Sequence, residues 1–259
     1  MLRKTGYERI AFVASPAPEA RKALARLTKR YGNVTLAKAD VVVALGGDGL
    51  MLRTLHKLMD TDKPIYGMHR GTIGFMMNEF REKGLRERLQ AAQTTVIHPL
   101  VMRARDTRGK LHEHYAINEV SLFRQTYQVA RLSIFIDGQE RLPELMADGV
   151  LVATPAGSTA YNLSAQGPII PINADLMAVT PISPFRPRRW RGALLPDSAR
   201  ITIRVIDPER RPVAAVADHA EVRSVRDVDI RMDHAVSMQM LFDPGHSLDE
   251  RILSEQFGH

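Results

Sequence analysis

The sequence predicts an α/β domain built on a parallel sheet, followed by a β-rich domain of mostly antiparallel strands. Three observations along the 259 residues support this order. Strand and helix patterns alternate over residues 1–95. Short strand patterns separated by turn signals occupy residues 96–235. The last segment, 236–259, has no comparable pattern, so its return to the first domain stays open.

The first domain is predicted from buried strands that alternate with amphipathic helices. Apolar runs typical of parallel strands with both faces covered occur at residues 9–14, 41–45 and 64–68. Apolar residues recur at helical spacing over 20–31 and 50–59. Ser15 and Pro16 are candidates for the start of the first helix, and Asn78 is a candidate N-cap for a third helix that runs to about Gln93. This β-α-β-α-β-α order indicates a Rossmann-like sheet.

The second domain is predicted from strand-like segments that are joined by turns. These segments lie at residues 100–104, 111–123, 130–136, 149–153, 200–206, 212–217 and 228–232. Asp137 and Gly138 follow the third of them and form a typical hairpin-turn pair. Strands joined by such turns run antiparallel.

Composition restricts the class of protein. Cysteine is absent, so disulfides and thiolate metal sites are excluded. No apolar run approaches the roughly 18 residues of a membrane helix, and no signal-peptide pattern is found, which predicts a cytoplasmic protein without a membrane partner. The formal net charge of +7 suits anionic partners such as nucleotides, polyphosphate or nucleic acid, or serves only solubility.

The motif Gly46-Gly47-Asp48-Gly49 stands between the predicted strand 41–45 and the next helix. Glycines at such a turn let phosphate approach the backbone, and a helix N-terminus attracts anions, so the three glycines are predicted to bind phosphate. Asp48 would repel phosphate unless it held Mg²⁺ or accepted a proton, as a kinase that acts on a hydroxyl requires. A glycine turn with an N-cap aspartate is the plainer alternative. The motif is neither a Walker A loop nor G-x-G-x-x-G.

A second glycine stretch, GTIGF at residues 71–75, follows the third predicted strand. Ligands of α/β sheets bind at this end of the strands. Phe75 could pack against a flat ring, or it could be an ordinary core aromatic. His69 and Arg70 precede the stretch, and Arg70 is a candidate for phosphate binding.

Asn118 and Glu119 form a polar pair within the predicted strand 111–123. Neighbouring strand residues point to opposite faces, so both could reach one ligand only at a bulge or a strand end. The amide could then pair with a base or ribose, and the carboxylate could accept a hydroxyl.

The segment 154–161, TPAGSTAY, follows Asp148 and the predicted strand 149–153. Its small and hydroxylated residues offer backbone N–H groups, hydroxyls and one aromatic ring, with little bulk to exclude a nucleotide. A tight turn with a helix cap is the alternative.

Together, GGDG, the pair Asn118-Glu119 and the long element DGVLVATPAGSTAY at 148–161 resemble NAD kinases of the bacterial type. GGDG alone is shared with diacylglycerol, sphingosine and 6-phosphofructo kinases, whereas the long element is more specific. The spacing of the other elements also fits, so the resemblance covers nearly the whole chain. It implies a Rossmann-like N-terminal domain, a β-rich C-terminal domain, and homo-oligomers that are often tetramers.

The resemblance also implies roles for the matching residues. Asp48 would be the base that activates the 2′-hydroxyl of the adenosine ribose, with Gly49 and Phe75 lining the same pocket. Asn118 and Glu119 would hold the ribose and adenine of NAD. The rest of NAD would be bound, in part from a neighbouring subunit, by Asp148, Thr159, Ala160, Tyr161 and Ser164. ATP or polyphosphate would be the donor, with Mg²⁺ on its phosphates and no protein residue assigned as a metal ligand.

The chain departs from the family pattern in its C-terminal half. Members usually have T-P-I-x-P-H before an R-P pair, whereas this chain has Phe185 at the histidine position and Arg191-Gly192 in place of R-P. Where many members have D-G, this chain has Asp218-His219. Because certain members carry histidine there, His219 is a candidate ligand contact.

Other features receive plainer interpretations. The arginines around Trp190, from Arg186 to Arg191, suit a loop or subunit interface better than a site for polyphosphate or nucleic acid. His112 and His114 lack an evident third metal ligand, so a solvated hairpin is favoured. The competing hypotheses are a lipid or sugar kinase of the GGDG group, a non-catalytic NAD-binding protein and a nucleic-acid-binding protein. The choices between ATP and polyphosphate, between NAD and NADH, and between dimer and tetramer stay open.

Overall fold

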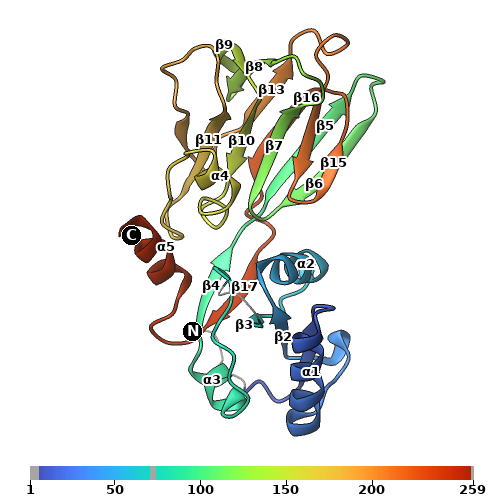
Figure 1. The fold of residues 1–259 in the computed structure, drawn as a ribbon, viewed down its shortest axis with the longest axis vertical. Helices are drawn as coiled ribbons and strands as arrows, with labels where there is room; N and C mark the ends of the chain where they lie inside the picture. Colours follow the sequence, from blue (N-terminus) through green and yellow to red (C-terminus); the bar gives the residue numbers. More distant parts are fainter. Residues whose placement is uncertain (1–5, 71–73, 258–259) are drawn as a thin grey trace. The chain divides into compact units, whose positions relative to one another are not determined.

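The computed structural model describes residues 6–70 and 74–257, which form two compact units (Figure 1). The first unit combines Met1–Ile97 with Val236–His259, and the second consists of His98–Ala235. The last segment of the chain therefore belongs with the first unit. Part of the second glycine stretch, residues 71–73, lies outside the described residues.

A five-stranded sheet in the order β1-β2-β3-β17-β4 is the basis of the first unit. Its strands are β1 (Ile10–Ala14), β2 (Val41–Gly46), β3 (Ile65–His69), β17 (Met238–Phe242) and β4 (Gln93–Ile97). β1, β2, β3 and β17 run parallel, and β4 pairs antiparallel with β17. Every residue of β2 is buried, as its unbroken apolar run predicts. The predicted parallel α/β sheet is confirmed.

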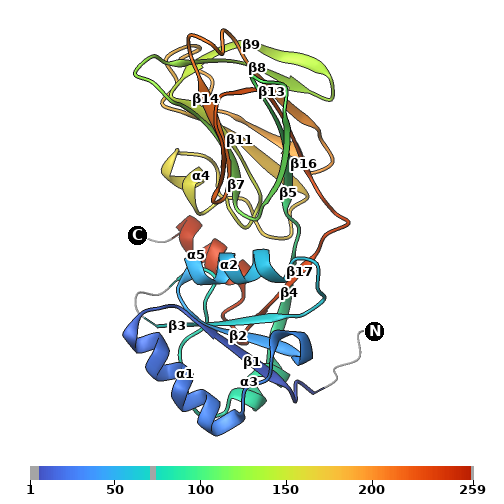
Figure 2. The same cartoon turned by 90° about the vertical axis from the view of Figure 1, so that its right-hand side faces the viewer.

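Helices cover both faces of this sheet. They are α1 (Pro18–Tyr31), the 3₁₀ turn η1 (Leu36–Lys38), α2 (Asp48–Leu58), α3 (Leu85–Ala91) and α5 (Leu248–Phe257). α1 packs Ala23 and Leu27 into a cluster with β2 and α3, while α2 lies on the opposite face (Figure 2). The predicted start of α1 at Ser15 or Pro16 is wrong, because Pro18 provides the proline of the first turn. No helix in the described ranges is both long and apolar enough to cross a membrane.

Asn78 does not cap a helix, and this prediction is wrong. The asparagine is fully buried, and its amide nitrogen donates to the carbonyls of Gly67 and Leu241, each at 3.0 Å. Its amide oxygen accepts the backbone N–H of Asp243 at 2.9 Å. These bonds join β3 to β17, so the side chain is used between strands, and α3 begins only at Leu85.

The second unit contains two six-stranded sheets whose neighbouring strands are antiparallel. One has the order β12-β11-β10-β7-β14-β15 and the other the order β6-β5-β16-β13-β8-β9. The first contains β7 (Glu119–Arg124), β10 (Gly149–Ala153), β11 (Leu176–Ile182), β12 (Ala193–Pro196), β14 (Val213–Ala217) and β15 (Ala220–Val222). The second contains β5 (Leu100–Asp106), β6 (Leu111–Ala116), β8 (Ala130–Ile136), β9 (Gln139–Ala147), β13 (Ile201–Val205) and β16 (Val225–Met232). Apolar residues of both sheets, such as Leu122 and Ile203, form one core, which confirms the β-rich domain.

The single strand predicted over 111–123 is wrong, since it divides into β6 and β7, which belong to different sheets. The division lies at Ile117 and Asn118. Their backbone N–H groups donate to the carboxylate of Asp218 at 2.7 and 3.0 Å. The carboxylate thus replaces strand partners at this break, and a residue that is distant in sequence decides where the strand ends.

A buried polar cluster attaches the end of β17 to the first unit. Asp243 accepts the hydroxyl of Tyr66 at 2.7 Å and the Nε of Arg88 at 3.1 Å, and its second oxygen also pairs with Arg88. The side chains of Arg88 and Asp243 are only 13% and 15% exposed. Burial alone would raise the pKa of Asp243, but the hydrogen bonds from Arg88 and Tyr66 bring that pKa below its ordinary value.

Asp243→Asn should reduce the free energy of unfolding by about 3 kcal/mol, because Arg88 would stay buried without its counter-ion. The contribution of the ionised carboxylate is present above the ordinary aspartate pKa of about 3.9 and is lost as the pH falls through the lower folded-state pKa. Urea unfolding at pH 7 and in acid measures both effects. Glu113→Gln removes the exposed partner of Arg103 and is the control, with an expected cost below about 1 kcal/mol. Equal losses for the two variants at pH 7 would contradict this role of Asp243.

Candidate functional site

The GGDG motif forms the turn from β2 to α2. β2 ends at Gly46, Gly47 is the N-cap residue, and Asp48 is the first residue of α2. Gly47 and Gly49 are exposed, whereas Asp48 is half-buried. The turn therefore combines an accessible helix N-terminus, which favours anions, with a carboxylate that is held close to it.

The Asp48 side chain reaches segment 74–76 rather than capping its own helix. Its Oδ2 accepts the N–H of Phe75 at 2.7 Å, and its Oδ1 accepts the N–H of Met76 at 2.9 Å. Gly74 is required for this approach, because a Cβ there would lie 2.4 Å from Asp48 Oδ1. Each oxygen keeps the capacity to accept a further hydrogen bond. The carboxylate is thus fixed by backbone donors and still able to take a proton, which the N-cap alternative does not explain.

Arg70 lies at the end of β3, beside the glycine turn. Its backbone N–H donates to the carbonyl of Gly46 at 2.9 Å. Its guanidinium pairs with Glu19 at 3.2 Å and lies 4.2 Å from the centre of the Phe80 ring. Its buried Nε has no hydrogen-bond partner among the described residues. Phosphate binding by Arg70 stays a prediction.

In the second unit, Asn118 lies in the break between β6 and β7, and Glu119 is the first residue of β7. A strand end is one of the two conditions under which we expected both side chains to reach one ligand. Asn118 Oδ1 and Glu119 Oε2 are buried and have no hydrogen-bond partner within the described chain. A buried acceptor without a donor costs free energy. The pair is therefore suited to a ligand that brings hydrogen-bond donors.

Glu119 also has an unusual protonation equilibrium. Its pKa is raised to about 7, chiefly by burial and then by the carboxylate of Asp218, while a hydrogen bond from the backbone of Tyr161 lowers it. Burial raises the pKa of Tyr161 too, and the charges of Glu119 and Asp148 raise it further. Tyr161 is therefore influenced by both carboxylates, whereas Glu119 and Asp148 themselves lie at opposite ends of the pairing between β7 and β10.

The segment 154–161 forms a buried turn after β10 and leads into the short helix α4 (Tyr161–Ser164). Thr154 Oγ1 donates to the carbonyl of Ile117 at 2.7 Å and accepts the N–H of Gly157 at 2.9 Å. A Cβ at Gly157 would lie 2.1 Å from the carbonyl oxygen of Asn118, so only glycine lets the turn pack against the strand break. The predicted NAD contacts that are half-buried or exposed here are Thr159, Ala160, Tyr161 and Ser164.

Asp148 and His219, which are also predicted NAD contacts, differ from each other in exposure and in partners. Asp148 precedes β10 and pairs with the Nε of Arg124 at 2.6 Å. His219 is exposed in the turn between β14 and β15, next to Asp218, whose φ is +50°. Sequence reasoning selected His219 and missed both Asp218 and Arg124. The aspartate of the D-G pair in related kinases was the signal that could have identified Asp218.

The histidine pair at 112 and 114 and the arginines around Trp190 have partners nearby. His112 Nε2 lies 3.0 Å from Asp106 Oδ2. Within residues 6–70 and 74–257, no three histidine, aspartate or glutamate side chains gather as a metal site. The guanidiniums of Arg186 and Arg188 each lie 5.6 Å from the centre of the exposed Phe185 ring. Nothing in these contacts assigns either cluster to the candidate site.

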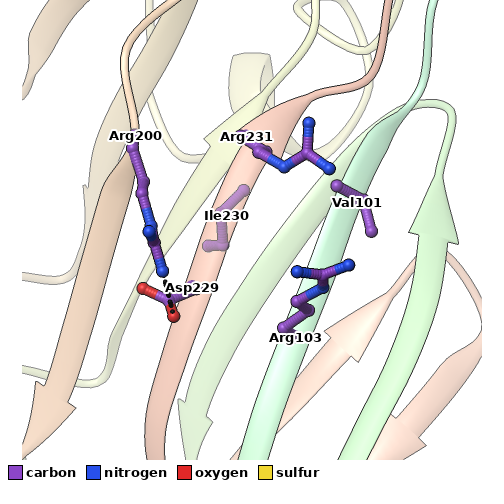
Figure 3. A pocket seen from close by; sticks show the side chains of 6 residues that line it. All are labelled: Val101, Arg103, Arg200, Asp229, Ile230 and Arg231. Carbon is purple, nitrogen blue, oxygen red and sulfur yellow. Dashed lines mark hydrogen bonds and ion pairs between the residues drawn. The ribbon is translucent and has the colours of Figure 1, made fainter. Parts of the chain in front are cut away.

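A small pocket of about 60 Å³ lies on the sheet formed by β5, β16 and β13 (Figure 3). Arg103, Arg200 and Arg231 line it together with Asp229. Arg200 pairs with Asp229 at 2.8 Å, and Arg103 pairs with Glu113 at 2.6 Å. Ligand pockets usually hold about 300–1,000 Å³. This pocket is therefore too small for a nucleotide, and most of its charge is compensated across strands.

An aspartate at an accessible helix N-terminus, in a chain of two compact units, is an arrangement suited to a two-domain phosphotransferase. Sequence models of the ATP-NAD kinase N-terminal domain and the ATP-NAD kinase C-terminal domain match residues 6–96 and 117–237, respectively. The chain therefore belongs to the NAD kinase family and is a kinase, which confirms the resemblance seen in its motifs.

Curated relatives support this membership over almost the whole chain. The NAD kinase of Hyphomonas neptunium is 58% identical over 249 residues, which are 96% of this chain and 98% of that protein. The NAD kinase of Caulobacter vibrioides is 59% identical, over 96% of each chain.

Solved structures share the fold at lower sequence identity. A yeast NADH kinase in complex with NADH has a TM-score of 0.84 at 22% identity, and the match covers 98% of this chain and 88% of that one. An NAD kinase from Archaeoglobus fulgidus in complex with ATP has a TM-score of 0.74 at 22% identity, with 96% and 97% covered. The predicted two-domain fold class is confirmed.

Glu119→Gln should raise the Tm more at pH 8 than at pH 5. The folded-state pKa of about 7 lies above the ordinary value of 4.5, so the folded state binds the proton more tightly. The stability contribution of Glu119 is therefore complete below pH 4.5 and is lost as the pH rises through about 7, whereas glutamine avoids this loss. Thermal unfolding at both pH values measures the difference, with Glu221→Gln on β15 as the exposed control. A gain that is the same at both pH values would argue against a carboxylate that is penalised by burial.

Proposed function

We propose that the chain transfers the γ-phosphoryl group of ATP to the 2′-hydroxyl of the adenosine ribose of NAD, which yields NADP and ADP. The observation that carries the proposal is the Asp48 carboxylate, which two backbone N–H groups fix at 2.7 and 2.9 Å while its oxygens can accept one more bond. The curated relatives named NAD kinase, at 58% and 59% identity, support it.

Asp48 would act as the general base. A ribose hydroxyl is a weak nucleophile at neutral pH, and a positioned carboxylate that takes its proton typically contributes about 10²–10⁴-fold. As the bond between the 2′-oxygen and the γ-phosphorus forms, the bond from that phosphorus to the bridging oxygen of ADP breaks. The exposed Gly47 and Gly49 leave the N-terminus of α2 accessible to phosphate, and Arg70 would add a positive charge.

Asn118 and Glu119 would hold the adenosine part of NAD. Their buried acceptors, Asn118 Oδ1 and Glu119 Oε2, lack donors, and an adenosine provides an amino group and ribose hydroxyls. The accessible face of the 154–161 turn would bind the remainder of NAD. The other residues that the family resemblance assigns to NAD binding stay predictions: Gly49, Phe75, Asp148, Thr159, Ala160, Tyr161, Ser164 and His219.

Mg²⁺ would arrive with the donor rather than occupy a protein cage. Mg²⁺ usually keeps several waters and binds substrate phosphates with one or two carboxylates. When bound, the ion would offset negative charge on the phosphates during transfer. Homo-oligomers and a cytoplasmic location also stay predictions.

The donor is tested by incubating the purified protein with NAD, Mg²⁺ and either ATP or polyphosphate, and by measuring NADP directly. We expect NADP with ATP, as the relative from Archaeoglobus fulgidus was solved in complex with ATP. Polyphosphate is the alternative donor, and NADH should be tested as acceptor beside NAD. If neither donor yields NADP while a lipid or sugar is phosphorylated, the proposed acceptor is wrong.

Asp48→Asn should lower kcat by about 10²–10⁴-fold, because the amide cannot accept the proton. The Tm should fall only modestly, since the amide oxygen can still accept one of the two backbone N–H groups while the other loses its acceptor. NADP formation and thermal unfolding are measured on the same preparation. Asp62→Asn, at an exposed loop residue before β3, is the matched control and should keep normal turnover. Near-normal turnover of Asp48→Asn would remove Asp48 from the role of base.

A further inference from the structure

We propose that Arg251, in the C-terminal helix α5, is a positioning residue that holds Asp48 in place through two backbone peptide groups. The inference rests on the proposed function, in which Asp48 is the base, and it adds how this chain fixes that base. It concerns the first unit alone.

Two consecutive peptide groups join the side chains of Arg251 and Asp48. In the peptide between Gly74 and Phe75, the oxygen accepts Arg251 Nη1 at 2.9 Å and the N–H donates to Asp48 at 2.7 Å. In the peptide between Phe75 and Met76, the oxygen accepts the same Nη1 at 3.1 Å and the N–H donates to Asp48 at 2.9 Å. Each peptide group therefore has the guanidinium at its oxygen and the carboxylate at its nitrogen.

This arrangement strengthens the hold on the carboxylate. A cation at a carbonyl oxygen polarises the peptide group, which makes its N–H a better donor. Hydrogen bonds to an ionised acceptor are already stronger than neutral ones. Arg251 thus sets both the position of segment 74–76 and the strength of the two donors that orient Asp48.

Arg251 is itself restrained on its other side. Its Nε donates to the carbonyl of His246 at 3.2 Å, and its guanidinium lies 5.7 Å from the centre of the Phe242 ring. Burial lowers the pKa of Arg251, while the charges of Asp48 and Asp243 act in the opposite direction. Partial burial of a guanidinium is unfavourable. In this proposal, orientation of the base Asp48 explains why Arg251 is partly buried.

Docking of α5 is the competing, purely structural interpretation of Arg251. The helix buries two apolar side chains, Leu248 and Ile252, and so has an anchor that does not depend on the arginine. Removal of the guanidinium should therefore disturb segment 74–76 more than it disturbs the attachment of α5.

The test measures NADP formation from NAD, ATP and Mg²⁺ by Arg251→Gln, Arg251→Lys and Arg86→Gln. Arg86 on α3 is the matched control, because its Nη1 also donates to two consecutive carbonyls, those of Tyr7 and Glu8, at 3.5 and 3.1 Å. Arg251→Gln should lower kcat by about 10- to 100-fold with little change in KM, since a misplacement of about 1 Å can cost about 100-fold. Arg251→Lys should recover part of this loss, and Arg86→Gln should keep normal kcat.

Guanidinium ion provides a second readout that a docking role would not move. Arg251 borders a hollow of about 470 Å³ together with Gly74, Phe75 and His246, which is large enough for the ion. Guanidinium at concentrations far below denaturing levels should raise the kcat of Arg251→Ala severalfold and leave wild type unchanged. Thermal unfolding confirms that each variant is folded at the assay temperature.

Three results would overturn the inference: normal kcat in Arg251→Gln, an equal loss in Arg86→Gln, or a rise in KM at constant kcat. Absence of guanidinium rescue in a folded Arg251→Ala would also count against it. Wild type and Asp48→Asn are assayed in parallel. If wild type forms no NADP, the proposed function fails; if Asp48→Asn keeps its activity, the role of Asp48 as base fails. If only the Arg251 variants behave normally, this inference fails alone.

Discussion

A carboxylate that accepts backbone N–H groups from a distant segment is the interaction on which both sets of site residues depend. In the first unit, Asp48 binds the N–H groups of Phe75 and Met76. In the second unit, Asp218 binds those of Ile117 and Asn118. In each case a carboxylate side chain satisfies backbone donors of residues that lie outside the helices and strands. Segments 74–76 and 117–118 are thereby held although they belong to no helix or strand.

These two carboxylates have different consequences for the groups beside them. Asp48 is itself the proposed functional group, and its partners leave room for one more proton donor. Asp218 acts through position and charge: it holds the break where Asn118 and Glu119 lie, and it helps to raise the pKa of Glu119. The second unit thus keeps unpaired acceptors and a carboxylate that resists ionisation, both of which oppose stability until a ligand supplies donors.

The return of the chain to the first unit completes this arrangement. Asn78 and the Arg88–Asp243 pair attach β17 to the sheet. α5 follows β17, and its Arg251 donates to the carbonyls beside the Asp48 partners. The C-terminal segment therefore contributes to the surroundings of the proposed base, although its own sequence has neither a glycine motif nor a distinct apolar pattern.

Much of the fold could be predicted, because the signals that define it are local. The apolar run of β2, the Asp137-Gly138 hairpin with φ of +51° and +79°, and the GGDG turn all depend on neighbouring residues. The predictions that failed concern residues whose side chains have distant partners. Asn78 resembles a helix cap locally but bonds to Leu241, and the strand 111–123 is divided by Asp218.

The sequence by itself determined the order of the two domains, the turn that carries Asp48 and the chemical types of the side chains at the sites, since backbone propensity and motif chemistry act over a few residues. Only the tertiary structure decided which donors hold Asp48, which acceptors at Asn118 and Glu119 stay unpaired, and that Arg251 approaches the same peptide groups. The reason is physical: a hydrogen bond or an ion pair depends on distance in space, and packing brings together residues that no sequence pattern connects.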